Sequence, residues 1–197
     1  LLVLFIMGSP VFAGAIQWNH NQKARAIGSG CSANTTAFIS AGDEISVVFS
    51  SLGIHLDSST NQYRDQKFCR LIIPAKVQKN KYLSRLVQTL TYGYVREGKT
   101  RGKIKIISKF DQKRAGKIII PIPTPREDPF HAPFAQKNLK FHWHNPGELC
   151  PQQSYRSRLV IRIALAARRR SLENQILIQT DGIDIRLNTK ATPRTCL

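Results

Sequence analysis

The sequence predicts an all-β fold, an antiparallel β-sandwich of about nine to eleven short strands with two disulfides. Three observations support this fold class. Apolar residues alternate with polar ones in short runs that recur along the chain and are separated by turn residues. Hydrophobic residues make up 42% of the 197 residues, which is enough for one sizeable core. The four cysteines include no Cys-x-x-Cys pair, which favours disulfides over zinc ligation.

The N-terminal segment 1–15 is typical of a signal peptide that is truncated at its start. An apolar run from Leu1 to Met7 is followed by a Gly-Ser-Pro helix breaker and by small residues around Ala13 and Ala15, where a signal peptidase would cut. The apolar stretch is too short to span a membrane. We therefore expect a secreted protein, periplasmic or extracellular, in which residues 16–197 form a single β-sandwich domain.

Export places the four cysteines in an oxidising compartment, where disulfides are their expected state. Four cysteines allow three pairings, and the sequence alone does not select one of them. We prefer the pairs that join neighbours along the chain, Cys31 with Cys69 and Cys150 with Cys196. Each pair would close a loop and stabilise the fold by about 4 kcal/mol through chain entropy.

The segment from Arg64 to Pro74 is the predicted central strand. Cys69, Leu71 and Ile73 alternate along it, so their side chains are expected to point into the core. Pro74 is expected to end the strand, because proline supplies no ladder donor. The Gly-Ser-Gly tripeptide before Cys31 predicts a tight turn that brings this cysteine to its partner.

The other candidate strands follow from alternation, and several carry a second interpretation. Residues 36–40 and 45–50 predict a hairpin. The segment 82–90 also matches a helical stripe, and a helix is the minority interpretation of 158–167. The Asp181-Gly182 dipeptide predicts the turn of a terminal hairpin. The remaining predicted strands are 52–56, 91–95, 103–110, 118–122, 139–143, 176–178 and 183–187.

Several of these segments together resemble a known family. They are the Gly-Ser-Gly-Cys31 opening, the Arg64–Cys69–Leu71 strand, Tyr92-Gly93-Tyr94, Trp143 ahead of Cys150, and the hairpin before Cys196. Over roughly residues 28–196, the chain is similar to domain-of-unknown-function family 4360, secreted four-cysteine proteins of fungi and some bacteria. The resemblance implies an exported β domain and supplies no catalytic residues.

The charge balance is the strongest functional signal. Thirty Lys and Arg oppose twelve Asp and Glu, giving a formal net charge of +18 that attracts polyanions. Tyr92 and Tyr94 lie within the stretch from Lys76 to Lys117, which is rich in Lys and Arg, and could stack on bases or sugar rings. The alternative is a solvated surface that only keeps the protein soluble. The residues expected to bind anions are Arg85, Arg96, Lys99, Arg101, Lys103, Lys105, Arg168, Arg169 and Arg170.

Other chemistry has weaker support in the sequence. His142 and His144 are two apart on a predicted strand and could share one metal ion, but two histidines on a solvated face usually have no such role. We expect no cofactor and no metal. A secreted hydrolase would need two carboxylates facing across a cleft. The candidate carboxylate pairs are Asp43 with Glu44, Glu127 with Asp128, and Asp181 with Asp184.

The sequence therefore predicts an exported, non-enzymatic protein that binds or structures an anionic polymer or glycan of the cell envelope through its basic surface. Two alternatives from other classes remain. One is a secreted hydrolase with a carboxylate pair in a cleft. The other is an extracellular nucleic-acid binder, although no recognised nucleic-acid-binding motif is present.

Overall fold

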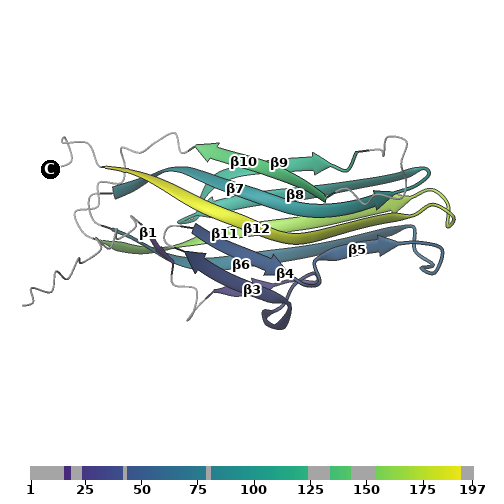
Figure 1. Cartoon of the computed structure of the whole chain (residues 1–197), viewed down its shortest axis with the longest axis horizontal. Coiled ribbons are helices and arrows are strands. Elements are labelled where there is room, and N and C mark those ends of the chain that lie inside the picture. The colour runs from purple at the N-terminus through teal and green to yellow at the C-terminus, as the bar shows by residue number, and fades with distance from the viewer. Residues whose placement is uncertain are drawn as a thin grey trace, which may run out of the picture.

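A computed structural model of the protein describes residues 16–18, 24–41, 44–78, 81–123, 134–142 and 154–191 (Figure 1). Over these ranges the protein is built almost entirely of β-strands, and its one helical turn is the 3-10 turn η1 (Ala33–Thr35). Two antiparallel six-stranded sheets pack face to face. The predicted antiparallel β-sandwich is confirmed. No helix in the described part of the chain is long and apolar enough to cross a membrane.

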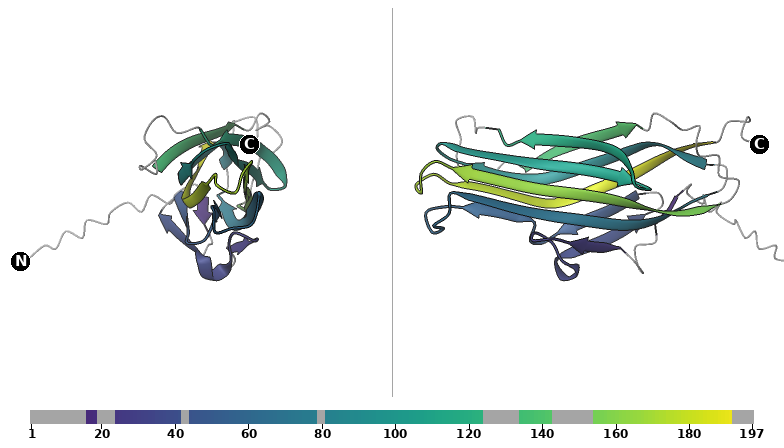
Figure 2. Two further views of the ribbon diagram at one scale, coloured as in Figure 1. Left: turned by 90° about the vertical axis from the view of Figure 1, so that its right-hand side faces the viewer. Right: turned by 180° about the vertical axis from the view of Figure 1, so that it is seen from behind.

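The first sheet contains six strands in the order β1-β6-β11-β8-β9, with β2 also paired to β6. Figure 2 shows this sheet in its view from behind, where β11 runs between β6 and β8. Its strands are β1 (Ile16–Trp18), β2 (Arg25–Ile27), β6 (Arg64–Val77), β8 (Thr100–Phe110), β9 (Lys113–Pro121) and β11 (Tyr155–Arg169).

The second sheet faces the viewer in Figure 1 and has the order β10-β7-β12-β4-β3, with β5 also paired to β12. Its strands are β3 (Thr36–Ala41), β4 (Glu44–Phe49), β5 (Gly53–Leu56), β7 (Lys81–Arg96), β10 (Phe134–His142) and β12 (Ile176–Ala191). The predicted hairpin is β3 with β4.

The core lies between the sheets and is made by alternate residues of the long strands. On β6, Cys69, Leu71 and Ile73 are fully buried, as the sequence predicts. Their neighbours on β11, Ile161 and Ile163, are also fully buried. Removing this much aliphatic surface from water is the main favourable term for folding. The intervening residues of both strands point outward, so they determine the charge and polarity of the outer surface of the first sheet.

Several strands are longer than predicted, because segments read as separate strands are continuous. The segments 82–90 and 91–95 are both parts of β7, which has 16 residues and is a strand throughout. Strand β11 has 15 residues, so the helical interpretation of 158–167 is wrong. Alternation prevails over the helical stripe because β7 and β11 each pair with two neighbouring strands over most of their length.

The predicted terminal hairpin is also wrong, because β12 runs straight through Asp181-Gly182. The register of its pairing with β7 shifts between Thr180 and Gly182, which marks a β-bulge. A Cβ atom on Gly182 would lie 3.0 Å from the carbonyl oxygen of Val47, so the glycine lets β4 approach closely. Pairing on both sides of β12 therefore overrides the turn preference of the dipeptide.

Pro74 does not end β6, which continues to Val77. The short strand β2 pairs with residues 70–72 of β6, and β1 pairs with residues 75–77. Pro74 lies between these two ladders. A proline is tolerated there because neither short strand needs its missing amide hydrogen.

The turn before β3 is fastened to β6 by the predicted Cys31–Cys69 disulfide, which joins residues 38 positions apart. The Gly30 amide donates a hydrogen bond to the Phe68 carbonyl over 3.0 Å. A Cβ atom on Gly30 would lie 3.2 Å from the Cβ of Lys67, so glycine permits this close approach. Some of the predictions fall outside the described residues. They concern the signal segment 1–15, the second disulfide between Cys150 and Cys196, and the side chains of His144, Asp43, Glu127 and Asp128.

Candidate anion-binding surface

The outward positions of the first sheet carry an unmixed positive charge. Wherever an outward residue of these strands is charged, it is Lys or Arg, and Asp and Glu occupy none of these positions in the described chain. We call this surface the basic face. Its cations are Arg25, Arg64, Arg70, Lys76, Arg101, Lys103, Lys105, Lys109, Arg114, Lys117, Arg156, Arg158, Arg162 and Arg168.

Many of these cations lie directly opposite one another on neighbouring strands. Arg168 of β11 is in register with Arg101 of β8 and with Arg64 of β6, which makes a row of three arginines. Arg162 is likewise opposite Arg70. Opposed residues on one face have Cβ atoms about 5 Å apart, and like charges so placed destabilise a sheet. The free protein therefore carries an electrostatic cost along this face.

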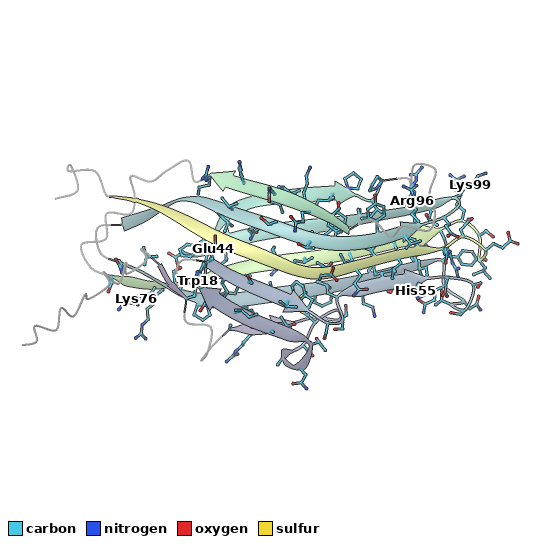
Figure 3. The ribbon with its side chains drawn as sticks, viewed as in Figure 1. Trp18, Glu44, His55, Lys76, Arg96 and Lys99 are labelled. Atoms are coloured by element: carbon cyan, nitrogen blue, oxygen red, sulfur yellow. A yellow bond between two sulfur atoms is a disulfide. The ribbon has the colours of Figure 1, made fainter. Side chains whose placement is uncertain are left out.

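The larger groove, of about 1090 Å³, lies at one end of the basic face. Figure 3 shows two of its residues, Arg96 and Lys99, at that end of the sandwich, whereas Lys76 is at the other end. Tyr63 forms part of its wall, with a side chain 53% exposed. No Asp or Glu of the described chain lines it. Its cationic lining residues are Arg64, Arg96, Lys99, Arg101, Lys103, Arg168, Arg169 and Arg170.

The smaller groove, of about 290 Å³, lies further along the same face. Arg70, Lys109, Arg158 and Arg162 line it together with apolar and amide side chains. Both grooves therefore combine cationic with apolar side chains.

The guanidinium of Arg169 is used inside the protein. The residue is only 4% exposed, and its side chain points inward, in line with Leu165 and Ala167 of β11. Its nitrogens donate hydrogen bonds to five backbone carbonyl oxygens, which belong to Asp57, Thr60, Gln62, Leu172 and Asn174. This residue fastens the loop after β5 to the turn after β11, so its role is structural.

Arg96 is similarly committed. Its guanidinium donates to the Ile122 carbonyl over 2.9 Å and to the Thr100 carbonyl over 2.6 Å. It thereby ties β7 to the ends of β8 and β9. Arg96 lines the larger groove, but its donors hold the backbone that shapes the groove.

The structure distributes the predicted anion-binding residues unevenly. It places a first set together on the basic face, namely Arg101, Lys103, Lys105 and Arg168. Lys99 and Arg170 follow at the rim of the larger groove, where the Arg170 amide donates to the Lys99 carbonyl. Arg85 belongs to β7 in the second sheet, apart from the others.

Sequence reasoning missed Arg64 and Arg70 on β6. Both alternate with Cys69 and Leu71, so the strand period that placed the cysteine in the core could have placed these arginines on the surface. Phe68, which is 55% exposed on the same face, was missed for the same reason.

Tyr92 and Tyr94 do not face a ligand. They are only 6% and 8% exposed, and their rings stack on each other inside the sandwich with centroids 6.2 Å apart. Burial raises the pKa of Tyr92, and the neighbouring Tyr94 adds to the effect. The prediction that these rings stack on bases or sugars is therefore wrong.

Asp57 and its neighbours form a closed loop. Its carboxylate accepts hydrogen bonds from the Ser59 hydroxyl over 2.6 Å and from the Ser59 amide over 3.0 Å, and it lies 3.1 Å from His55. The hydrogen bond from the Ser59 hydroxyl is the main reason that the pKa of Asp57 is lowered. These contacts join Asp57 to Ser59 in the same loop and to His55 near the end of β5, so they account for Asp57 without any catalytic role.

The candidate metal site and the candidate carboxylate pair have little support in the described structure. Strand β10 places His142 in register with Arg85. The described chain contains no group of three His, Cys, Asp or Glu residues that could hold a metal ion. Asp181 lies at the bulge of β12 and Asp184 lies further along the same strand, in register with Ser46. Asp181 lines neither of the two grooves described above.

The family described as "Domain of unknown function (DUF4360)" matches residues 21–196. The chain belongs to this family. This confirms the resemblance drawn from the cysteine and glycine segments. No curated protein matches this DUF4360 chain.

Some solved structures share its outline only distantly. The carbohydrate-binding module TmCBM61 in complex with β-1,4-galactotriose has 11% identity and a TM-score of 0.29, covering 84% of this chain and 89% of that one. A structure described as "CBM4 structure and function" has 9% identity and a TM-score of 0.21, over 90% and 85% of the two chains. The tailspike protein 4 domain of bacteriophage CBA120 has 12% identity and a TM-score of 0.28, and the match spans 21% of its length. At these scores the likenesses carry no functional argument.

Proposed function

We propose that this DUF4360 protein is an exported, non-enzymatic binding protein whose basic face holds an acidic polysaccharide of the cell envelope or its surroundings. The observation that carries the proposal is the composition of that face, in which every charged outward residue is a cation. A surface of one sign concentrates ligands of the opposite sign and raises their association rates. A surface of mixed charges would be sufficient for solubility, so a face that carries only positive charge favours a role in binding a ligand.

The second sheet provides an internal contrast. Its strands mix both signs of charge. Strands β4 and β12 contain Glu44, Asp181 and Asp184, and β7 and β10 carry Arg85 and Lys140 beside neutral Thr89 and Asn138, whose side chains hydrogen bond over 2.8 Å. The excess of cations is therefore concentrated on one side of the sandwich. A directional charge of this kind supports docking through one face.

The dimensions of the basic face fit a linear polymer. Strand β6 has 14 residues and β11 has 15, which corresponds to about 45 Å of surface at the strand repeat. Exposed Ile27, Phe68 and Ile119 interrupt the cations along this length. Apolar patches between charges suit sugar rings, which have apolar faces and carry their acidic groups at the edge. The Cys31–Cys69 disulfide supports the oxidising, extracytoplasmic setting in which such polymers occur.

A salt titration with matched variants tests the proposal. The purified protein is titrated with polygalacturonate, heparin and DNA between low and physiological salt, and we expect binding to a polysaccharide that weakens steeply with salt. The variant K103Q/K105Q should reduce the slope of log affinity against log salt by about 1 to 2. The control K137Q/K140Q removes two exposed lysines from β10 of the second sheet and should bind like the parent.

Four results would overturn the proposal. Polysaccharide binding that does not change with salt, or equal losses in both double variants, would remove the basic face from the interaction. Binding to DNA alone would identify a nucleic-acid binder. A decrease in the length of the polysaccharide during incubation, measured by size-exclusion chromatography, would identify a hydrolase.

A further inference from the structure

The centre of the basic face contains a strip of small residues. Along β11 the outward positions run from Arg168 through Ala166 and Ala164 to Arg162. Longer side chains flank the alanines on both neighbouring strands. Gln66 and Phe68 of β6 stand on one side, and Lys103 and Lys105 of β8 stand on the other. We call this strip the alanine channel, because its floor is lower than its walls.

Arginine rows close both ends of the channel. At one end Arg168 stands between Arg64 and Arg101, in the larger groove. At the other end Arg162 stands beside Arg70, in the smaller groove. The strand from Arg162 to Arg168 spans about 20 Å at the usual rise per residue. The larger groove and the smaller groove thus lie at the two ends of this row of alanines.

The chemistry of the two ends is that of oxyanion binding. A guanidinium presents its donors as a planar fork that fits carboxylate, sulfate or phosphate oxygens in a bidentate manner. Arginines stacked side by side repel one another when no anion lies between them. An oxyanion at either row would therefore form strong hydrogen bonds and relieve that repulsion.

We propose that the alanine channel seats one linear stretch of acidic oligosaccharide along β11, with an acidic group of the sugar chain bound at each arginine row. The inference rests on the proposed function and specifies where and how the polymer binds. Sugar rings lie over Ala164 and Ala166, where no side chain obstructs them. Phe68 and Tyr63, both more than half exposed, provide apolar contact beside the chain and at its exit. A small anion would occupy only one row, so the site selects for length.

A length series tests the two-ended geometry. Oligogalacturonates, which carry carboxylates, and heparin fragments, which carry sulfates, are titrated by calorimetry at fixed salt. We expect a step in affinity of about 100-fold once the oligosaccharide is long enough to span both rows, because the second contact then becomes intramolecular. The series that shows the step identifies the acidic group.

Two variants separate the channel from its charge. A166L fills the floor and leaves the net charge unchanged, and it should abolish the step while the affinity of short fragments is retained. The matched control A37L places the same change at an exposed outward position of β3, in the second sheet, and should keep the step. R162Q removes one clamp only, so long and short fragments should then bind with similar affinity. If A166L fails to fold, the R162Q variant still tests whether both arginine rows are needed for the step in affinity.

The outcomes distinguish this inference from the function on which it rests. Affinity that rises smoothly with fragment length, and is unchanged in A166L and R162Q, would refute the channel while salt-dependent binding to the basic face still stood. Absence of binding to every polyanion would refute both. A step that survives in A166L and disappears in A37L would place the ligand on the second sheet and would also refute the channel.

Discussion

Replacing Arg169 with alanine should destabilise the fold strongly, because the buried guanidinium holds the backbone of two neighbouring loops. The buried guanidinium donates to five carbonyl oxygens, with distances of 2.7 Å to Asp57 and Leu172 and 2.8 Å to Gln62. A hydrogen bond that involves a charged group contributes about 1.5 to 3 kcal/mol. Water can reach part of the vacated site at this end of the sandwich, so the bonds do not sum. We expect a loss of about 3 kcal/mol in the free energy of unfolding.

Urea denaturation followed by tryptophan fluorescence measures this loss as a shift in midpoint at constant slope. Arg168→Ala is the matched control, because Arg168 is the next residue and points outward on the basic face. It should change the free energy of unfolding by no more than about 0.5 kcal/mol. Arg169→Lys should recover part of the loss, since an ammonium supplies three donors in place of five. A midpoint for Arg169→Ala equal to that of Arg168→Ala would refute the role of the guanidinium.

Three further predictions concern stability. Removing the Cys31–Cys69 disulfide by double serine substitution should lower the free energy of unfolding by about 4 kcal/mol, because the bridge closes a loop of 38 positions; urea curves with and without reductant check this. Since the folded pKa of Tyr92 is raised, stability should fall as pH rises above about 10, where the unfolded tyrosine ionises, and Tyr92→Phe should lessen that fall in urea midpoints. The lowered pKa of Asp57 acts on stability in the opposite direction. The stabilisation that Asp57 contributes is present above the ordinary carboxyl pKa and is lost as pH falls through the pKa of the folded state. Carboxyl NMR titration should show the lowering in the parent and a smaller one in Ser59→Ala.

The inward half of the fold could be predicted because burial leaves a period in the sequence. Cys69, Leu71 and Ile73 alternate with polar residues, and the same alternation recurs in β8 and β11. The disulfide between Cys31 and Cys69 agrees with the preference for pairing cysteines that are neighbours along the chain. Local pattern is sufficient for such features, since each depends on one strand and its two faces.

Sheet membership could not be predicted, because strands of both sheets alternate in the same way. Strand β6 pairs with β11, about ninety residues later in the chain, and that pairing brings Arg70 beside Arg162. The arginine row at Arg168 depends on two such pairings. The basic face is therefore a property of the topology, and the sequence shows only its separate strands.

Local turn chemistry was the least reliable guide. Asp181-Gly182 has the composition of a hairpin turn, yet β7 on one side and β4 on the other hold it in a strand. Arg169 lies in a run of three arginines, which predicts a surface position. Its position two residues after Ala167 places it on the buried side, where the loop carbonyls satisfy it. In both cases tertiary contacts outweigh composition.

The opposed arginines also predict a link between the proposed ligand binding and the stability of the fold. Like charges in register lower the stability of the free sheet, and a bound oxyanion removes that cost only in the complex. A ligand at a hundred times its dissociation constant stabilises the native state by about 2.7 kcal/mol. Loss of the Arg168 charge therefore relieves repulsion in the free protein and weakens the stabilisation by ligand, so the two effects have opposite signs. A merely solubilising surface would show the first effect without the second, because nothing binds between its charges.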